Sequence, residues 1–295
     1  MRMLWSKPHW QWLMVALAAA GWLLYVAPVM AQSPEPSAKV RVVTTLFPLY
    51  DFVRIVGGER VEAVMLVPPG SDPYGYQPQP SDLETINSAD IFLYASEATE
   101  PWVEPLLPSI TNQNLLIMAA ANSAGAATHL QPDAAVWLNL SGDPAIVDDV
   151  VDDLVTADES GRDYYLARAS EYKERLIALE RRYEAALQDC RNRTMVFYGQ
   201  PVFAGLARKH HLILKDCKTA EELVNVIKES GVGIYFFSDA ADVKLMEGVS
   251  EKTGVRQQLL SSAAVVTAEQ LRNGTTFLGI MEEDLAGLRQ GLECR

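Results

Sequence analysis

A long stretch without proline lies in the second half of the chain and limits the folds open to it. Residues 161–190 contain glycine only at their first position, and their apolar side chains recur at intervals of three and four residues. These apolar residues are Tyr165, Leu166, Tyr172, Leu176, Leu179, Tyr183 and Leu187. The spacing predicts a helix from about 163 to 189, roughly 40 Å long at 1.5 Å per residue. Such a helix is long enough to span a molecule with two lobes.

Strand and helix patterns alternate on both sides of this stretch. The predicted strands are residues 40–46, 62–67, 90–95, 114–119, 194–199, 212–214, 233–238 and 256–261. Predicted helices between and after them include residues 48–57, 81–88 and 276–292. Continuous apolar strands flanked by helices are typical of a parallel sheet covered on both faces. We therefore predict an α/β fold: two parallel-sheet α/β lobes joined by one long backbone helix, with a ligand cleft between the lobes at the carboxyl ends of the strands.

The N-terminus has the features of a secretory signal peptide. Arg2 and Lys7 precede an apolar run at 13–29, and Val29-Met30-Ala31 fits a small-residue cleavage site. An uncleaved membrane anchor stays open as the alternative, because the run is nearly long enough to span a bilayer. The predicted parts are a signal peptide (1–31), a tether (32–39), an N-terminal α/β lobe (40–160), the linking long helix (161–190) and a C-terminal α/β lobe (191–295).

The net charge and the motif content exclude two broad classes of function. Removing residues 1–31 removes two basic and no acidic residues, so the formal net charge moves from −13 to −15. A domain this acidic lacks the electrostatic features of a nucleic-acid binder. A nucleophile elbow, a P-loop, a G-x-G-x-x-G turn and a paired-carboxylate motif are absent from the sequence, so we expect no enzyme.

Three cysteines remain in an exported chain, where disulfides persist. Cys190 ends the predicted long helix and Cys294 ends the last helix, so both are expected at the amino edge of the second sheet. Cys217 follows the carboxyl end of a strand, on the other side. We favour a Cys190–Cys294 disulfide with Cys217 free, and the other pairings stay open.

The loop VPPGSDPYGYQPQPSD (67–82) is stiffened by prolines and carries Tyr74 at its centre. Loops at the ends of strands often contact ligands. This loop leaves the carboxyl end of a strand, so we expect Tyr74 to face the cleft. Ser81 and Glu84 fit a capping box and predict a helix start after the loop.

Several segments together resemble the periplasmic binding proteins that deliver zinc or manganese to ABC importers. They are VVTTLFPLYDFV (42–53), VPPGSDPYGYQPQPSDL (67–83), SADIFLY (88–94), EPWVEPLL (100–107), DAAVWLNL (133–140), VFYGQPVFAGLARKHHL (196–212) and GTTFLGIMEEDLAGLRQGL (274–292). The resemblance covers nearly the whole exported chain. It implies two α/β lobes joined by a long backbone helix, a periplasmic location and a membrane ABC permease as partner. We expect a monomer.

The family's metal ligands are replaced in the first two segments that carry them. The family's first loop typically reads G-x-x-P-H-x-Y-E-P, in which the histidine binds metal. Tyr74 stands at that position here, and Gln77 replaces the acid. The family's D-P-H before the V-W-L stretch is Asp133-Ala134-Ala135 in this chain, so Ala135 takes the place of the second histidine.

The remaining two ligand positions are also changed. The best alignment places Gln200 at the third histidine and Ala268, beside Glu269, at the acidic fourth position. Alanine offers no donor, and a tyrosine phenol with a pKa near 10 is a poor ligand at neutral pH. Zinc sites need imidazole, thiolate or carboxylate ligands. We therefore expect the usual metal site to be lost and no metal cofactor, with zinc or manganese as the ligand if this interpretation is wrong.

Three functional alternatives follow from the changed ligands. In the first, the cleft binds a small polar organic ligand through Tyr74, Tyr76, Tyr198 and Gln200, with Trp137 as an aromatic wall; alternatively, Tyr74 and Gln200 fill the emptied site and bond to each other. In the second, Glu269 holds manganese or magnesium with Asp72, His129 or water. In the third, the protein is an accessory or partner-binding module without a transport role.

Overall fold

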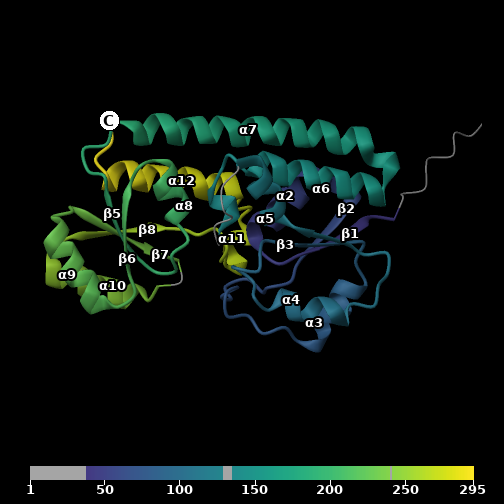
Figure 1. Ribbon diagram of the computed structural model, residues 1–295, viewed down its shortest axis with the longest axis horizontal. Helices are drawn as coiled ribbons and strands as arrows, with labels where there is room; N and C mark the ends of the chain where they lie inside the picture. The colour runs from purple at the N-terminus through teal and green to yellow at the C-terminus, as the bar shows by residue number, and fades with distance from the viewer. Residues whose placement is uncertain (1–37, 129–134, 240) are drawn as a thin grey trace, which may run out of the picture. The chain divides into compact units, whose positions relative to one another are not determined.

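Two four-stranded parallel sheets form the framework of the computed structural model, which describes residues 38–128, 135–239 and 241–295 (Figure 1). The first sheet has the order β2-β1-β3-β4 and contains β1 (Val40–Thr44), β2 (Val61–Met65), β3 (Ile91–Tyr94) and β4 (Leu116–Ala119). The second has the order β6-β5-β7-β8 and contains β5 (Thr194–Tyr198), β6 (Ile213–Cys217), β7 (Ile234–Ser238) and β8 (Arg256–Leu260). We call the halves built on these sheets the N-terminal and the C-terminal lobe. The predicted fold class is confirmed.

Helices cover the sheets, as continuous apolar strands require. The helices of the N-terminal lobe are α2 (Phe47–Gly57), α3 (Pro80–Asn87), α4 (Val103–Leu106), α5 (Ala120–Thr128) and α6 (Asp143–Ala157). Those of the C-terminal lobe are α8 (Ala204–Lys209), α9 (Ala220–Ser230), α10 (Val243–Thr253), α11 (Ala268–Arg272) and α12 (Phe277–Gly291). Short 3₁₀ turns are η1 (Gly58–Arg60), η2 (Leu107–Ser109), η3 (Val136–Leu138) and η4 (Glu159–Gly161). In the part of the chain that the structure describes, no helix is both long and apolar enough to cross a membrane.

Both sheets have the same topology, in which the first strand lies inside and the chain leaves it in both directions. β1 pairs in parallel with β2 and β3, and β5 pairs in parallel with β6 and β7. The connection after the first strand therefore covers one face and the two later connections cover the other, and the order reverses beside the first strand of each lobe. Ligands of such sheets bind at the carboxyl ends of the strands near this reversal.

The long helix α7 (Arg162–Gln188) has 27 residues and starts and ends one residue before the predicted limits. It packs against α2 and α6 of the N-terminal lobe and α12 of the C-terminal lobe, and Figure 1 shows it running along both. All the predicted apolar positions are buried except Leu166, which is exposed. Residues Lys39–Arg295 form one compact unit by their contacts. The finer domain boundaries stay a prediction, and the predicted signal peptide and most of the tether lie outside the described residues.

The cysteine prediction is confirmed. Cys190 and Cys294 form a disulfide that joins the segment after α7 to the C-terminal end of the chain. Backbone N–H groups of Arg191 and Asn192 donate to carbonyls of the same C-terminal segment. Cys217 is the last residue of β6, and its free thiol is buried.

The predicted capping box at Ser81 is wrong. α3 begins at Pro80, and Gln79 is its N-cap, whose backbone N–H donates to the Asp82 carboxylate at 2.7 Å. Proline fits the first helical position because it lacks the N–H that would otherwise be unpaired there. The helix therefore starts earlier than the Ser81-to-Glu84 spacing indicated.

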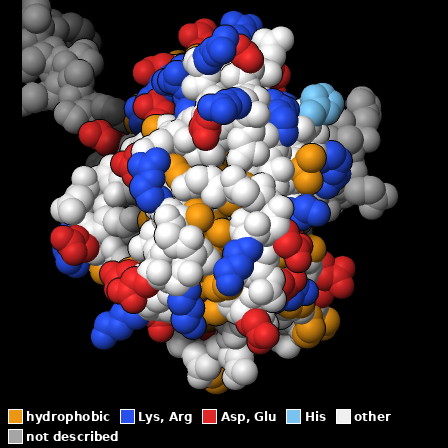
Figure 2. All heavy atoms as spheres, turned by 90° about the vertical axis from the view of Figure 1, so that its left-hand side faces the viewer, with side chains coloured by type: hydrophobic (Ala, Val, Ile, Leu, Met, Phe, Trp, Pro, Cys, Tyr) orange, Lys and Arg blue, Asp and Glu red, His pale blue; other side chains and the backbone are white. Residues whose placement is uncertain are grey.

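Figure 2 looks onto the end of the C-terminal lobe. Lys and Arg side chains alternate there with Asp and Glu, and the apolar areas between them are small and separate. Scattered apolar side chains are ordinary for a protein surface. This face therefore carries no continuous field of one charge.

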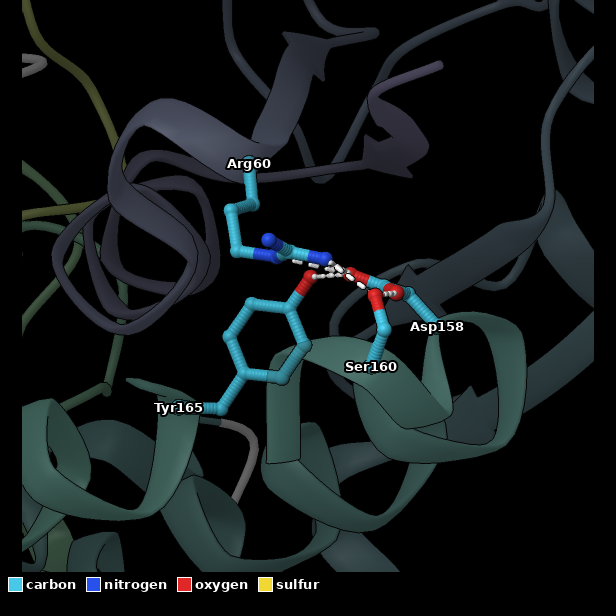
Figure 3. A network of polar contacts seen from close by, with 4 residues as sticks. All are labelled: Arg60, Asp158, Ser160 and Tyr165. Carbon is cyan, nitrogen blue, oxygen red and sulfur yellow. Dashed lines mark hydrogen bonds and ion pairs between the residues drawn. The ribbon is translucent and has the colours of Figure 1, made fainter. Parts of the chain in front are cut away.

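A polar network holds the start of α7 against the N-terminal lobe (Figure 3). Arg60, at the end of η1, donates from Nε to Asp158 Oδ2 at 2.8 Å, and Tyr165 of α7 donates its hydroxyl to the same oxygen at 2.8 Å. Ser160 Oγ donates to Asp158 Oδ1 at 2.6 Å. Burial alone would raise the pKa of Asp158, but the hydrogen bonds from Ser160, Arg60 and Tyr165 outweigh it and lower the pKa below 3.8.

We expect Asp158→Asn to lower the free energy of unfolding by about 2 kcal/mol at pH 7, because a charged acceptor of several hydrogen bonds is lost. Since the pKa of Asp158 is lower in the folded state, the carboxylate stabilises the fold above about pH 4, and this contribution is lost as the pH falls further. Urea unfolding at pH 7 and pH 3 should show the two proteins converging at acid pH.

The matched control is Glu159→Gln, one residue along the chain. Glu159 pairs with Arg162 on the surface, and its side chain is 75% exposed. We expect this substitution to leave the free energy of unfolding nearly unchanged, because the pair is exposed to solvent. Equal losses in the two variants would contradict the role assigned to Asp158.

Candidate functional site

Tyr74 lies in the loop between β2 and α3, with its backbone N–H donating to Asp72 Oδ1 at 3.0 Å. Its ring packs against the main core. The hydroxyl oxygen is buried and has no hydrogen-bond partner among the described residues. Tyr74 therefore does not bond to Gln200, as one of the sequence-based alternatives required.

The groups around the Tyr74 hydroxyl are acidic and come from both lobes. Burial raises the pKa of Tyr74 most, and the negative charges of Asp239, Asp72 and Glu100 raise it further. Asp239 directly follows β7 of the C-terminal lobe, whereas Asp72 and Glu100 belong to the N-terminal lobe. Among the described residues, no basic group takes part in this shift. The phenol therefore stays neutral in a region of uncompensated negative charge.

Glu100 follows β3 and is fully buried. Its Oε2 accepts the backbone N–H groups of Ala95 and Ser96, both at 2.9 Å, whereas Oε1 has no hydrogen-bond partner in the described part of the chain. Burial raises the pKa of Glu100 to about 7, although Thr45 and the two amides lower it. This carboxyl group therefore changes charge near neutral pH.

Asp239 is held by the segment that follows β8. Ser261 Oγ donates to Asp239 Oδ2 at 2.8 Å, and Ser262 Oγ donates to Oδ1 at 3.3 Å. Burial raises the pKa of Asp239, and the two serine hydroxyls lower it only in part. Asp284 of α12 accepts the Ser261 backbone N–H at 2.9 Å. Three segments of the C-terminal lobe, at the end of β7, after β8 and on α12, thus meet at Ser261.

Two hydrogen bonds join the lobes next to these residues. Trp137 of η3 is fully buried and donates from Nε1 to the Ser262 carbonyl at 2.7 Å. The Gly70 N–H, in the same loop as Tyr74, donates to the Val266 carbonyl at 2.8 Å. We call the region of Tyr74, Glu100, Asp239 and Ser261–Ser262 the lobe junction. Ala135, which we predict from the sequence to take the place of the second family histidine, is buried, and its side chain offers no donor atom.

The other predicted site residues lie elsewhere. Tyr76 donates its hydroxyl to Asp82 at 2.8 Å, and its ring lies 5.2 Å from that of Trp102. Tyr198 and Gln200 line a cavity of about 530 Å³ whose described walls all come from the C-terminal lobe. Ala268 and Glu269 are exposed on α11. The structure brings Tyr74 together with Asp239, which the sequence did not single out.

The described histidines do not join the lobe junction. His210 ends α8, and burial together with Lys209 lowers its pKa to about 4. His211 is exposed. His129 lies outside the described residues. Across the described ranges, no three His, Cys, Asp or Glu side chains form a group that could hold a metal ion.

The residues that sequence reasoning missed share one recognisable position. Asp239 and Ser261 each come directly after the end of a strand, and Glu100 lies six residues after β3. Polar residues at the carboxyl ends of parallel strands are candidates for ligand contacts. That signal was available for Asp239, whereas Asp284 lies within the last helix and carried no such mark.

Comparison with known proteins gives a match over most of the chain. Residues 42–291 match the family described as zinc-uptake complex component A, periplasmic (ZnuA). The zinc-binding protein AdcA of Streptococcus pyogenes serotype M1 is 25% identical over 287 residues, covering 85% of this chain and 56% of that protein. The high-affinity zinc uptake system protein ZnuA of Bacillus subtilis (strain 168) is 23% identical, covering 86% of this chain and 88% of that protein. The chain spans about half the length of its AdcA relatives.

Solved structures confirm the fold. The crystal structure of Zn(II)-bound AdcA from Streptococcus pneumoniae superposes with a TM-score of 0.78 at 24% identity, covering 87% of this chain and 58% of that one. The Zn(II)-bound ZnuA-like domain of the same protein gives a TM-score of 0.77 and is covered over 100% of its length. At this level of identity the likeness concerns the backbone architecture, not the ligand.

The buried carboxyl group of Glu100 should make stability depend on pH. Because its pKa is raised to about 7, the folded state is favoured below the unfolded pKa of about 4.5, and this contribution is lost as the pH rises to 7. We expect Glu100→Gln to remove this loss, so that the variant gains up to about 3 kcal/mol over the wild type between pH 4.5 and pH 8. Urea unfolding across this range measures the difference.

Glu104→Gln is the control, since Glu104 is exposed and its carboxylate accepts only a surface-side bond from the Tyr94 hydroxyl at 3.2 Å. The free energy of unfolding of Glu104→Gln should vary with pH in the same way as that of the wild type. A Glu100→Gln profile parallel to the wild-type profile would show that Glu100 does not titrate near neutrality.

Proposed function

The chain belongs to the family of the periplasmic component A of zinc-uptake complexes, and we propose that it is an exported solute-binding component of an ABC importer. This is a family of binding proteins and not of enzymes. The proposal includes transfer of the exported chain to the periplasm and docking on a membrane permease. Support comes from the match over residues 42–291 and from the predicted signal peptide.

The ligand that the geometry favours is a metal ion held by oxygen donors at the lobe junction. One observation carries this proposal: the buried Tyr74 hydroxyl has no hydrogen-bond partner among the described residues, and acidic groups of both lobes, Asp239, Asp72 and Glu100, raise its pKa. Carboxylates left without a counter-charge in a buried region are costly. A cation between the lobes would offset that cost and would join the two halves.

The donors differ from the histidine set of the family, and we propose that this set has been lost. Tyr74, Ala135, Gln200 and Ala268 stand at the four ligand positions. The raised pKa of Tyr74 keeps its phenol neutral, so it can contribute only a weak donor oxygen. A metal ion here would depend on Asp239 and on the nearby acidic residues, with Glu269 remaining a candidate only if α11 moves.

A second candidate is a small polar organic ligand in the cavity of the C-terminal lobe. Tyr198, Gln200 and Lys218 line this space of about 530 Å³ at the carboxyl ends of β5 and β6. Phenol, amide and ammonium groups bind polar ligands by hydrogen bonds without a metal. The position beside the reversal of strand order is a common ligand site in such sheets.

Titration calorimetry of the exported, EDTA-stripped chain with zinc and manganese tests the first proposal. We expect one ion to bind, and Tyr74→Phe to weaken it severalfold because a junction oxygen is removed. Gln200→Ala should leave metal binding unchanged, since Gln200 lies in the separate cavity.

The absence of heat with either ion up to high micromolar concentration would overturn metal binding and favour the organic ligand. In that case Gln200→Ala, and not Tyr74→Phe, should abolish binding in a screen of small polar molecules. Failure of both searches would favour an accessory module without a transport role.

A further inference from the structure

An acidic cavity lies on the C-terminal-lobe side of the lobe junction, between the ends of β7 and β8 and helix α12. Its volume is about 380 Å³. Polar residues on its wall are Asp239, Gln258, Ser261, Thr267, Gln270, Glu283 and Asp284. Among the described residues that line it, three are acidic and none is Lys, Arg or His. The cavity therefore combines apolar side chains with three acidic ones, and its described wall is free of basic side chains.

One serine connects the two carboxylates at the inner end of this cavity. Ser261 donates from Oγ to Asp239 Oδ2 at 2.8 Å and from its backbone N–H to Asp284 Oδ1 at 2.9 Å. Two carboxylates bonded to the same residue must lie close together. Each therefore experiences the negative charge of the other, as the raised pKa of Asp284 from burial and then from Asp239 also indicates.

The second carboxylate oxygen of Asp284 gives an independent indication that a ligand belongs at this position. Asp284 is only 4% exposed, and its Oδ2 is buried with no hydrogen-bond partner among the described residues. A buried, unsatisfied carboxylate oxygen costs more than a typical lost hydrogen bond. Either a proton on Asp284 or a bound cation would remove this cost, and the two can be distinguished by experiment.

We propose that Asp239 and Asp284 together hold a hard divalent cation, of the magnesium, manganese and calcium class, with Ser261 Oγ and water completing its shell. This inference rests on the proposed function, because it names the class of cation and adds Asp284 to the acidic groups of the lobe junction. Ions of this class take oxygen ligands and keep several waters, so one or two carboxylates suffice to bind them. Zinc prefers imidazole and thiolate ligands, which the described wall does not supply.

Calorimetry of the EDTA-stripped exported chain with magnesium, manganese, calcium and zinc tests the assignment. We expect at least one of the three hard ions to bind, and Asp284→Asn to weaken it by about tenfold or more, because a direct ligand loses its charge. Glu283→Gln makes the same change of charge one residue away, on an exposed side chain at the rim. Its effect should stay below about threefold.

Thermal unfolding separates a ligand from a merely structural residue. Addition of the hard ion should raise the Tm of the wild type and of Glu283→Gln, whereas the Tm of Asp284→Asn should not respond. If Asp284→Asn does not fold, Ser261→Ala provides the second test, since it removes the hydroxyl bonded to Asp239 and should also weaken binding.

The outcomes distinguish this inference from the proposed function. Submicromolar zinc binding of equal affinity in the wild type and in Asp284→Asn would overturn the inference. The proposed function, a metal-binding component of an importer, would then remain. A hard ion that binds equally to the wild type and Asp284→Asn, but not to Tyr74→Phe, would likewise exclude Asp284 and keep the junction site. If none of the four ions binds, metal binding at the lobe junction and the cation site at Asp239 and Asp284 are both wrong. In that case Asp284 carries a proton.

Discussion

The packing of α7 against both lobes fixes where the two sheets meet. Tyr172 of this helix lies 5.7 Å from the Phe52 ring of α2, and Tyr183 donates its hydroxyl to the Met281 carbonyl of α12 at 2.6 Å. The same buried core continues through both lobes, with the rings of Phe52 and Phe277 5.2 Å apart. A shared core of this kind resists wide separation of the lobes, because opening would expose apolar surface. The carboxyl ends of both sheets are thereby held face to face.

This arrangement explains why charge gathers without compensation at the lobe junction. Several charged groups elsewhere have partners of opposite charge: Arg60 bonds to Asp158, and Lys209 pairs with Glu180. At the junction, Glu100 and Asp239 instead accept backbone N–H groups or serine hydroxyls. Such bonds stabilise a carboxylate but supply no opposite charge. Buried charge of one sign is a common feature of sites built to receive a ligand.

The sequence was sufficient for the architecture but not for the site. Periodicity located the long helix to within one residue at each end, and the placement of helix ends led to the Cys190–Cys294 disulfide. The family resemblance is confirmed by the match over residues 42–291. The architecture and the family resemblance both depend on local sequence patterns that persist along the chain. Asp239 and Asp284 were missed because they act together only after β7 and α12 have packed. Trp137 was expected as the wall of a cleft, whereas its Nε1 is engaged by the Ser262 carbonyl.

Family membership and ligand chemistry constrain different parts of this molecule. The backbone follows that of zinc-bound relatives with a TM-score of 0.78 at 24% identity, because the fold depends on apolar periodicity and strand topology. Metal selectivity depends on a few donor atoms, which the fold does not require. The likeness to zinc-bound relatives therefore does not settle the ligand of this chain, and we infer that the acidic groups after the strand ends and on α12 determine which ion it prefers.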